Sequence, residues 1–493
     1  MTRVVRNMDK KPPNLNVHDH SHSVNRFAVI PTADRLKADS RFTGRDVTIA
    51  FLDSGFHRHP DLVEPNNRIG VFHDVSGQET TTNSDQLPES WHWHGTQTTV
   101  AAAGNGQLCD GKYRGIASDA RLVLVKVSKN GRISEENIAK GLRWVIKNRE
   151  RFSIRVLNIS LGGDEDVPCS QSTIDQLAEE AIRQGIIVVV AAGNTTDHVP
   201  IPPANSPSVI TVGGYDDGNN PGQKDLGLYH SSFGVTAGGT VKPELIAPAM
   251  WVAAPILPNT RDYERAEALS RLAAAPDYQL RSLARDLEET AELPESIAIA
   301  DVTTIRHFVE STLESHKIVA THYQHVDGTS FAAPIVSSIV AQMLEANPKL
   351  TPGAVKNILI STADRITTAP AIRQGYGVVN PRRAVELAFR EEHELKTVGC
   401  SPPRVENGRL IFLYHDDEAK SVSLVGDFNG WDTASTPLWK DESGLWLVEV
   451  DAPKAGSYQY KFIVDGSRWL EDPSNGMKVP DNYGGLNSVL AID

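Results

Sequence analysis

The sequence predicts an α/β domain, with a mostly parallel sheet and helices on both of its faces, followed by a smaller β-sandwich. Short runs rich in Val and Ile recur from residue 46 onward without strict alternation, as expected of strands that are covered on both faces. Helical patterns at 134–148 and 172–184 lie between these runs. After residue 391 short alternating strands replace the helical patterns, which is typical of an immunoglobulin-like β-sandwich.

The predicted strands of the first domain end in residues that can carry chemistry. Asp53 follows the first apolar run, and Asn194 follows the fourth. Because ligands bind at the carboxyl ends of the strands in open parallel sheets, we expect a functional site at this edge. The runs lie at 46–52, 121–127, 156–160, 186–192 and 209–213.

Changes in composition divide the chain into several parts. Residues 261–287 are rich in Ala, Leu, Arg and Glu at helical spacing, and a second helical pattern follows at 302–315, so we interpret this region as a helical insertion. Whether it is a lid, a docking face or a surface excursion without a role stays open. The predicted parts are an extension at 1–45, the α/β domain at 46–395 with its insertion at 258–320, a linker at 396–404 and the sandwich at 405–493.

The bulk composition argues against several classes of protein. The 493 residues carry a net charge of −13, whereas a nucleic-acid binder needs a basic face. No run of about 18 apolar residues occurs, and the polar start of the chain lacks a signal-peptide pattern, so we expect neither membrane insertion nor secretion. The cysteines, Cys109, Cys169 and Cys400, are odd in number and far apart, which fits a reducing compartment. We therefore expect a cytoplasmic protein.

Four segments of the first domain each carry one reactive group. A serine hydroxyl becomes an effective nucleophile when a base takes its proton, and a histidine held by a carboxylate can do this near neutral pH. A side-chain amide can donate a hydrogen bond to the oxyanion that develops. A serine at a helix N-terminus also has backbone N–H groups near that oxyanion. The four groups are Asp53 after an apolar run, His94 in Trp93-His-Gly-Thr96, Asn194 after Ala-Ala-Gly, and Ser330 in Gly328-Thr-Ser-Phe-Ala-Ala-Pro334.

In this order the four segments resemble the motifs of the subtilisin (S8) family of serine proteases, and the intracellular subtilisins are the most similar in style. The resemblance covers residues 46–395 apart from the insertion. It implies a serine endopeptidase that hydrolyses protein or peptide substrates through an acyl-enzyme. In that mechanism Asp53 orients His94, His94 is the general base, Ser330 attacks, and Asn194 donates to the oxyanion. Two alternatives stay open: a catalytically silent scaffold with the same fold, and an esterase or transacylase with the same triad.

The resemblance also implies a substrate-binding segment. Residues 158–163, Asn-Ile-Ser-Leu-Gly-Gly, look like the family's substrate-lining segment. There Ser160, Leu161 and Gly162 would pair with the substrate backbone as an added strand.

Three nearby positions need a separate interpretation. Gln97 stands where the family usually has histidine, and Asp327 stands where a serine usually precedes the Gly-Thr-Ser motif. Neither belongs to the triad, although Asp327 could change pKa values near the nucleophile. His92 is not followed by Gly-Thr, so we interpret it as structural or solvent-exposed.

We expect no metal site and no cofactor, because neither zinc-ligand spacing nor an EF-hand loop occurs. The acidic and amide residues at 216–220 could bind calcium, as some relatives do, and a solvated loop is the interpretation that we favour. The alternating His18, His20 and His22 could bind a transition metal, and here a disordered polar tail is favoured.

The N-terminal extension suggests one way of holding a cytoplasmic protease inactive. Residues 1–45 are too few for the folded pro-domain of secreted relatives. Phe27-Ala-Val-Ile-Pro31 is similar to the apolar-Ile-Pro motif of the inhibitory segment in intracellular subtilisins. One hypothesis is that residues 20–35 cross the active-site cleft, and a packing arm is the alternative that we favour.

The C-terminal part resembles a family 48 carbohydrate-binding module. The resemblance rests on Gly426-Asp-Phe-Asn-Gly430 with the following tryptophan, and on Tyr458-Gln-Tyr-Lys-Phe462. It implies binding of glycogen or another α-glucan, because indoles stack on sugar rings while cations and amides bond to hydroxyls. In the alternative interpretation the tryptophans are core or interface aromatics. The implied glucan-contacting residues are Trp431, Lys461, Trp469, Tyr483 and Asn487.

Overall fold

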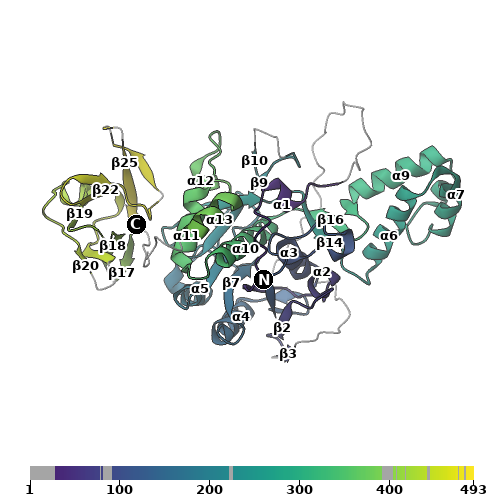
Figure 1. Cartoon of the computed structure of the whole chain (residues 1–493), viewed down its shortest axis with the longest axis horizontal. Helices are drawn as coiled ribbons and strands as arrows, with labels where there is room; N and C mark the ends of the chain where they lie inside the picture. Colours follow the sequence, from purple (N-terminus) through teal and green to yellow (C-terminus); the bar gives the residue numbers. More distant parts are fainter. Residues whose placement is uncertain are drawn as a thin grey trace.

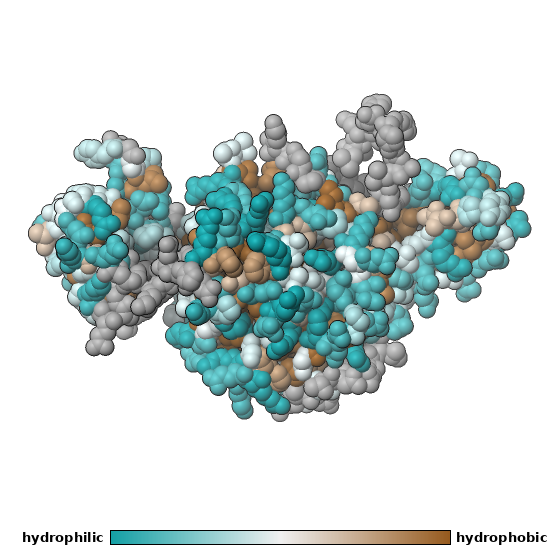
Figure 2. Space-filling model, viewed as in Figure 1, coloured by the Kyte–Doolittle hydropathy of each residue, from teal (hydrophilic) through white to brown (hydrophobic). Residues whose placement is uncertain are grey.

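The computed structural model contains an α/β domain, a helical insertion and a C-terminal domain of two sheets (Figure 1). Hydrophilic residues cover most of the described surface on the side seen in Figure 2. No helix of the described residues is both long and apolar enough to cross a membrane. The histidines at 18, 20 and 22, residues 20–27 and Cys400 lie outside the described residues, which are 28–77, 79–81, 92–220, 226–390, 403–406, 408–416, 418–440, 445–475, 477–481, 483 and 485–492.

The central sheet of the α/β domain is nine-stranded and mostly parallel. Its order is β10-β9-β8-β7-β1-β4-β2-β3, and β13 also pairs with β9. Strand β1 is buried along its whole length between β4 and β7, which run parallel to it, and this explains its continuous apolar sequence. The strands are β1 (Thr48–Asp53), β2 (Ile69–Asp74), β3 (Glu79–Thr81), β4 (Arg121–Lys126), β7 (Ile154–Ile159), β8 (Ile187–Ala191), β9 (Ile210–Asp216), β10 (Gly227–Leu228) and β13 (Leu245–Pro248).

Helices cover both faces of this sheet, as Figure 1 shows. Helices α3, α10, α11 and α13 share one hydrophobic core with the sheet, and α4 and α5 share the other. The predicted α/β fold class is thereby confirmed. The helices are α1 (Thr32–Arg35), α2 (Pro60–Val63), α3 (Trp93–Ala103), α4 (Glu135–Asn148), α5 (Thr173–Arg183), α10 (Thr329–Ala346), α11 (Pro352–Thr362), α12 (Ala371–Gln374) and α13 (Pro381–Arg390).

The insertion has a hydrophobic core of its own and begins and ends at one small sheet. That sheet has the order β14-β16-β15, and its strand β16 ends just before the turn that carries Ser330. The insertion therefore leads directly into the turn that carries Ser330. Its elements are β14 (Val252–Pro255), α6 (Arg261–Ala274), α7 (Asp277–Asp286), α8 (Glu295–Ala298), α9 (Val302–Ser315), β15 (Ile318–Ala320) and β16 (Tyr323–Val326).

The C-terminal domain is a sandwich of two antiparallel sheets with a shared core, as predicted. One sheet has the order β17-β18-β21-β20; the other has the order β19-β22-β25-β24, with β23 on β22. The strands are β17 (Arg404–Glu406), β18 (Arg409–His415), β19 (Val422–Gly426), β20 (Trp439–Lys440), β21 (Leu445–Asp451), β22 (Gly456–Val464), β23 (Arg468–Leu470), β24 (Lys478–Pro480) and β25 (Leu486–Ile492). Short pairs also form between β5 (Ser128–Lys129) and β6 (Arg132–Ile133), and between β11 (Gly234–Val235) and β12 (Val241–Lys242).

Candidate active site

Asp53 and His94 meet at the carboxyl edge of the central sheet. Asp53 is the last residue of β1 and is 1% exposed. His94 is the second residue of α3, and its Nδ1 lies 2.8 Å from Asp53 Oδ1. The Ser54 backbone N–H donates to the same carboxylate oxygen at 2.6 Å, and the Thr98 hydroxyl donates to Oδ2 at 3.2 Å. Both oxygens of the carboxylate therefore accept hydrogen bonds, and the bond to Oδ1 holds the imidazole in one orientation.

The charge of Asp53 sets the protonation of His94. Burial disfavours the imidazolium, but the negative charge and hydrogen bond of Asp53 outweigh this effect, so the pKa of His94 is raised. The close approach of α3 depends on Gly95, because a Cβ there would lie 2.2 Å from the carbonyl oxygen of Gly55.

Ser330 is the second residue of α10, which packs in one hydrophobic core with α3, the helix of His94. Gly328 precedes the helix at φ +140°, a conformation that favours glycine, and its N–H donates to Ala249 O at 2.7 Å. The ring of Phe331, the next residue, lies 5.9 Å from the His94 ring between centroids. In the described part of the chain no hydrogen bond joins the Ser330 hydroxyl to His94. Such bonds are often long in enzymes without substrate.

Asn194 is held against the residue that precedes Ser330. Its Oδ1 accepts hydrogen bonds from the backbone N–H and from the hydroxyl of Thr329, both at 2.9 Å. The Thr329 hydroxyl in turn accepts from the Gly193 N–H at 3.2 Å. Among the described residues nothing accepts a hydrogen bond from Asn194 Nδ2, so this N–H group can donate to another molecule.

The predicted substrate-binding segment follows β7 directly. Within the described chain, the backbone of Leu161 and Gly162 makes no hydrogen bond to other backbone groups, which leaves an edge for an added strand. The side chain of Ser160 contacts α10 instead, because its hydroxyl donates to the carbonyl oxygen of Ser330 at 2.9 Å. It also accepts from Asn158 Nδ2 at 3.0 Å, so the segment is tied to α10.

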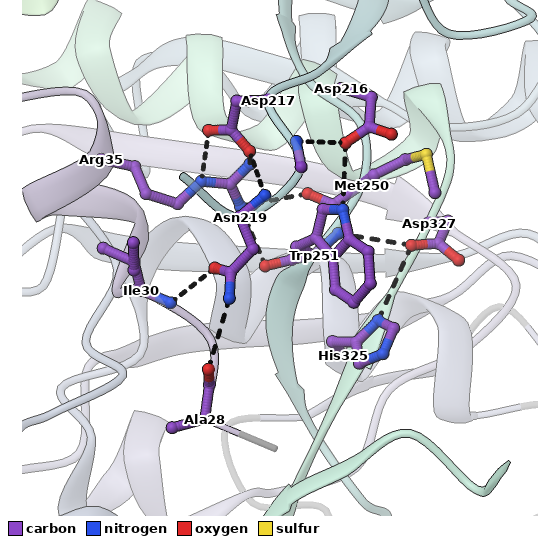
Figure 3. A network of polar contacts seen from close by, with 11 residues as sticks. Ala28, Ile30, Arg35, Asp216, Asp217, Asn219, Met250, Trp251, His325 and Asp327 are labelled. Carbon is purple, nitrogen blue, oxygen red and sulfur yellow. Dashed lines mark hydrogen bonds and ion pairs between the residues drawn. The ribbon is translucent and has the colours of Figure 1, made fainter. Parts of the chain in front are cut away.

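The loop at 216–220 is exposed at Gly218 and Asn220, but three of its polar side chains are bonded to other parts of the domain. Asp217 forms a buried ion pair with Arg35 at 2.7 Å. Asp216 accepts from the Trp251 indole at 3.0 Å, and Asn219 accepts from the Ile30 N–H at 2.8 Å (Figure 3). Protein donors thus bond to both oxygens of Asp217, to Oδ1 of Asp216 and to Oδ1 of Asn219. In the described chain no group of three or more His, Cys, Asp or Glu side chains could hold a metal ion.

The three positions that needed a separate interpretation, Gln97, His92 and Asp327, make contacts within the α/β domain and its insertion. Gln97 is 2% exposed and donates to Pro255 O at 2.9 Å, which ties α3 to β14. His92 is buried, and its ring lies 2.3 Å from where a Cβ of Gly55 would be. Asp327 forms an ion pair with Lys317, and side-chain hydrogen bonds and positive charges outweigh burial to hold its pKa near 2.

Sequence reasoning missed two residues of this site, Thr98 and Thr329. Thr98 stands four residues after His94, and this spacing places two side chains on the same face of a helix. The spacing could therefore have indicated a contact with the same carboxylate. Thr329 gave no comparable signal, because its partner Asn194 is distant in the sequence.

Four of the five candidate glucan-contacting residues take part in two chains of hydrogen bonds. The Trp431 indole donates to Asp427 at 2.9 Å, Asp427 accepts from the Gln459 N–H at 2.7 Å, and Gln459 Oε1 accepts from Asn487 at 2.8 Å. The second chain joins Lys461 to Asp481, whose other oxygen accepts from the Tyr483 N–H at 2.9 Å.

Strand alternation places three of these residues on the outer face of the β22 sheet. Tyr460 and Phe462, the neighbours of Lys461 on β22, point into the sandwich core, so Lys461 points outward. Trp469 lies opposite Ile463, and Val489, two residues after Asn487, lies opposite Gln459, so the strand register places Trp469 and Asn487 on the same outer face. Trp469 is 47% exposed and Tyr483 96%, whereas Lys461 and Asn487 are buried. The aromatic rings, rather than the cation, are therefore the accessible part.

Comparisons with known proteins agree with this architecture. The model of the subtilase family, Peptidase_S8, matches residues 44–377, and the model of carbohydrate-binding module 48 (isoamylase N-terminal domain) matches residues 397–478. Serine protease AprX of Bacillus subtilis (strain 168) is 30% identical over 353 residues, which are 70% of this chain and 67% of AprX. The major intracellular serine protease of the same strain is 32% identical over 159 residues, 31% of this chain and 44% of that protein.

The fold is also that of a solved structure, the CspB protease of Clostridium perfringens. Its TM-score is 0.53 at 17% identity, and the likeness covers 74% of this chain and 98% of that chain. At this identity the likeness shows the fold alone. The family model, which spans well over half of the chain, shows more: the chain belongs to the subtilase family of serine peptidases and carries a family 48 carbohydrate-binding module.

Proposed function

We propose that the protein is a serine endopeptidase in which Asp53, His94 and Ser330 form the catalytic triad and Asn194 the oxyanion donor. The observation that carries the proposal is the 2.8 Å hydrogen bond between His94 and the buried carboxylate of Asp53, with the ring of Phe331, the residue after Ser330, against the His94 ring. His94 Nδ1 then donates to Asp53, which leaves Nε2 to accept the serine proton.

The proposed reaction has two acyl-transfer steps. The Ser330 oxygen bonds to the scissile carbonyl carbon while its proton passes to His94, and Asn194 Nδ2 donates to the oxyanion. His94 returns the proton to the leaving amine as the C–N bond breaks. Water, deprotonated by His94, then releases the acid from the ester. Leu161 and Gly162 would hold the substrate as an added strand.

A fluorophosphonate probe tests the nucleophile. We expect labelling of the full chain at Ser330, loss of the label in Ser330→Ala, and retention in Ser361→Ala, which removes an exposed hydroxyl on α11. An unlabelled wild-type protein would favour the silent scaffold. Peptide-library cleavage then separates an endopeptidase from an esterase or transacylase, because the latter two would leave internal peptide bonds intact.

For the C-terminal module we propose binding of an α-glucan such as glycogen. The family model and the exposed rings of Trp469 and Tyr483 support this proposal. Affinity electrophoresis in glycogen, with the full chain carrying Ser330→Ala, tests it. Trp469→Ala should abolish the retardation, and Trp439→Ala, which removes a ring 57% exposed on the other sheet, should not. Equal mobility with and without glycogen would refute the proposal.

A further inference from the structure

Arg35 is a fully buried cation that ends α1. The exposed fraction of its side chain is 0%, and that of its partner Asp217 is 6%. Nε and Nη2 donate to the two oxygens of Asp217 at 3.0 and 2.7 Å. Nη1 donates to the carbonyl oxygens of Met250 and Trp251 at 3.0 and 2.9 Å (Figure 3). A buried pair of this kind is strongly destabilising to break, because one charge is left without compensation.

The residues before Arg35 are held by the same loop. Asn219 Oδ1 accepts from the Ile30 N–H at 2.8 Å, and its Nδ2 donates to Ala28 O at 3.3 Å. Val29, between them, is 3% exposed and packs in a cluster with Tyr323 of β16. Residues 28–36, which we call the N-terminal arm, are therefore fastened by side chains and by backbone to the α/β domain.

The N-terminal arm holds Trp251 in a strained backbone conformation. Trp251 adopts φ +59°, which is unfavourable for a residue with a bulky side chain. Such a conformation persists only when several contacts with the surrounding structure hold the residue in place. Arg35 binds the Trp251 carbonyl, Asp216 accepts from its indole at 3.0 Å, and Asp327 accepts from its backbone N–H at 3.3 Å.

The segment 249–251 connects Arg35 to the nucleophile turn. Arg35 binds the carbonyls of Met250 and Trp251, and the carbonyl oxygen of the preceding residue, Ala249, accepts the Gly328 N–H at 2.7 Å. Asp327, which is bonded to Trp251, precedes that glycine, and Ser330 follows it by two residues. A displacement of this segment would therefore move the backbone from which the nucleophile projects.

We propose that Arg35 is a positioning residue for Ser330, so that the N-terminal arm supports catalysis instead of crossing the active-site cleft. Arg35 acts through the carbonyls of Met250 and Trp251 on the turn at 327–328. The proposal rests on the proposed function, because it requires that Ser330 is the nucleophile. A displacement of about 1 Å in the reacting geometry can lower turnover by about 10²-fold.

The test compares Arg35→Met, Arg35→Lys and the control Arg41→Met, whose ion pair with Asp39 is exposed. Steady-state kinetics on a peptide p-nitroanilide give kcat and KM, and fluorophosphonate gives the rate of Ser330 labelling. Below the unfolding temperature of every variant, we expect a fall in kcat of about tenfold or more for Arg35→Met with KM changed less than about twofold. Arg35→Lys keeps the charge but not the planar guanidinium, so its kcat should lie between those of Arg35→Met and wild type. The kcat of Arg41→Met should equal that of wild type.

A double variant separates positioning from stability alone. Arg35→Met with Asp217→Asn removes both charges and so avoids an uncompensated buried carboxylate. The positioning role is supported if the melting temperature of this variant is close to that of wild type while fluorophosphonate labels its Ser330 more slowly. Wild-type kcat and labelling rate in any folded Arg35→Met variant would overturn it. Full turnover in Ser330→Ala would instead overturn the proposed function.

Discussion

Pro334 in α10 removes a backbone hydrogen-bond donor, and the hydroxyl of Ser160 replaces it. The energetic coupling between these two residues can be measured. A proline has no N–H, so the carbonyl oxygen of Ser330, four residues earlier, lacks its usual helical donor. The Ser160 hydroxyl takes that place at 2.9 Å. Ser160→Ala leaves the Ser330 carbonyl and Asn158 Nδ2 without this partner, and an unsatisfied buried group costs about 1–3 kcal/mol. We expect a loss of about 2 kcal/mol in the unfolding free energy of the α/β domain.

Pro334→Ala restores the missing donor, which turns the argument into a double-mutant cycle. In the Pro334→Ala background the alanine N–H can bond to the Ser330 carbonyl, so Ser160→Ala should cost about 1 kcal/mol less than in the parent. Urea unfolding followed by tryptophan fluorescence measures this, with every variant in a Ser330→Ala background to prevent autolysis. Ser338→Ala, whose hydroxyl bonds within α10, should show no coupling to Pro334. A coupling energy of zero for Ser160 would show that the proline does not explain the contact.

Two further predictions concern catalysis and acid stability. Thr329→Val removes one of the two bonds that orient Asn194, so kcat should fall about fivefold, the equivalent of about 1 kcal/mol, in steady-state kinetics, whereas Thr329→Ser should keep wild-type kcat. Burial, with the nearby charges of His57 and His322, lowers the pKa of His59 to about 3, so below pH 6.5 the unfolded chain binds a proton that the folded chain does not. His59 alone should therefore lower the unfolding free energy by up to about 1.4 kcal/mol per pH unit between pH 6.5 and about 3, in addition to the losses from His57 and His92, whose pKa values burial lowers to about 4. His59→Asn, which can still cap α2, should reduce the loss that urea unfolding measures between pH 7 and 5.

The sequence predicted those features that local pattern determines. Continuous apolar runs identified the parallel strands, and the ends of these runs identified Asp53 and Asn194, because side chains at the carboxyl ends of parallel strands meet at one edge. The family motifs added His94 and Ser330. The structure brings Asp53 to His94 and Asn194 to the turn of Ser330, and the catalytic roles of all four stay predictions.

The sequence could not predict contacts whose partners are distant along the chain. Arg35 and Asp217 are 182 residues apart, and no sequence pattern around either residue predicts a contact with the other. A carboxylate in a loop of Asp, Gly and Asn therefore suggests solvent or calcium, whereas here a buried guanidinium occupies it. Ser160 shows the same limit, because its backbone position was predicted but the partner of its hydroxyl was not.

These distant contacts converge on a single short turn. Ser160 bonds to the carbonyl of Ser330, Asn194 bonds to Thr329, and Asp327 is bonded to Trp251 on one side and to Lys317 on the other. Each contact comes from a different part of the chain: the segments that follow β7 and β8, the residue before β14, and the end of the insertion. Because several independent contacts fix the turn, the loss of one should lower turnover partly, and combined losses should exceed the sum of single effects once the strained Trp251 can relax.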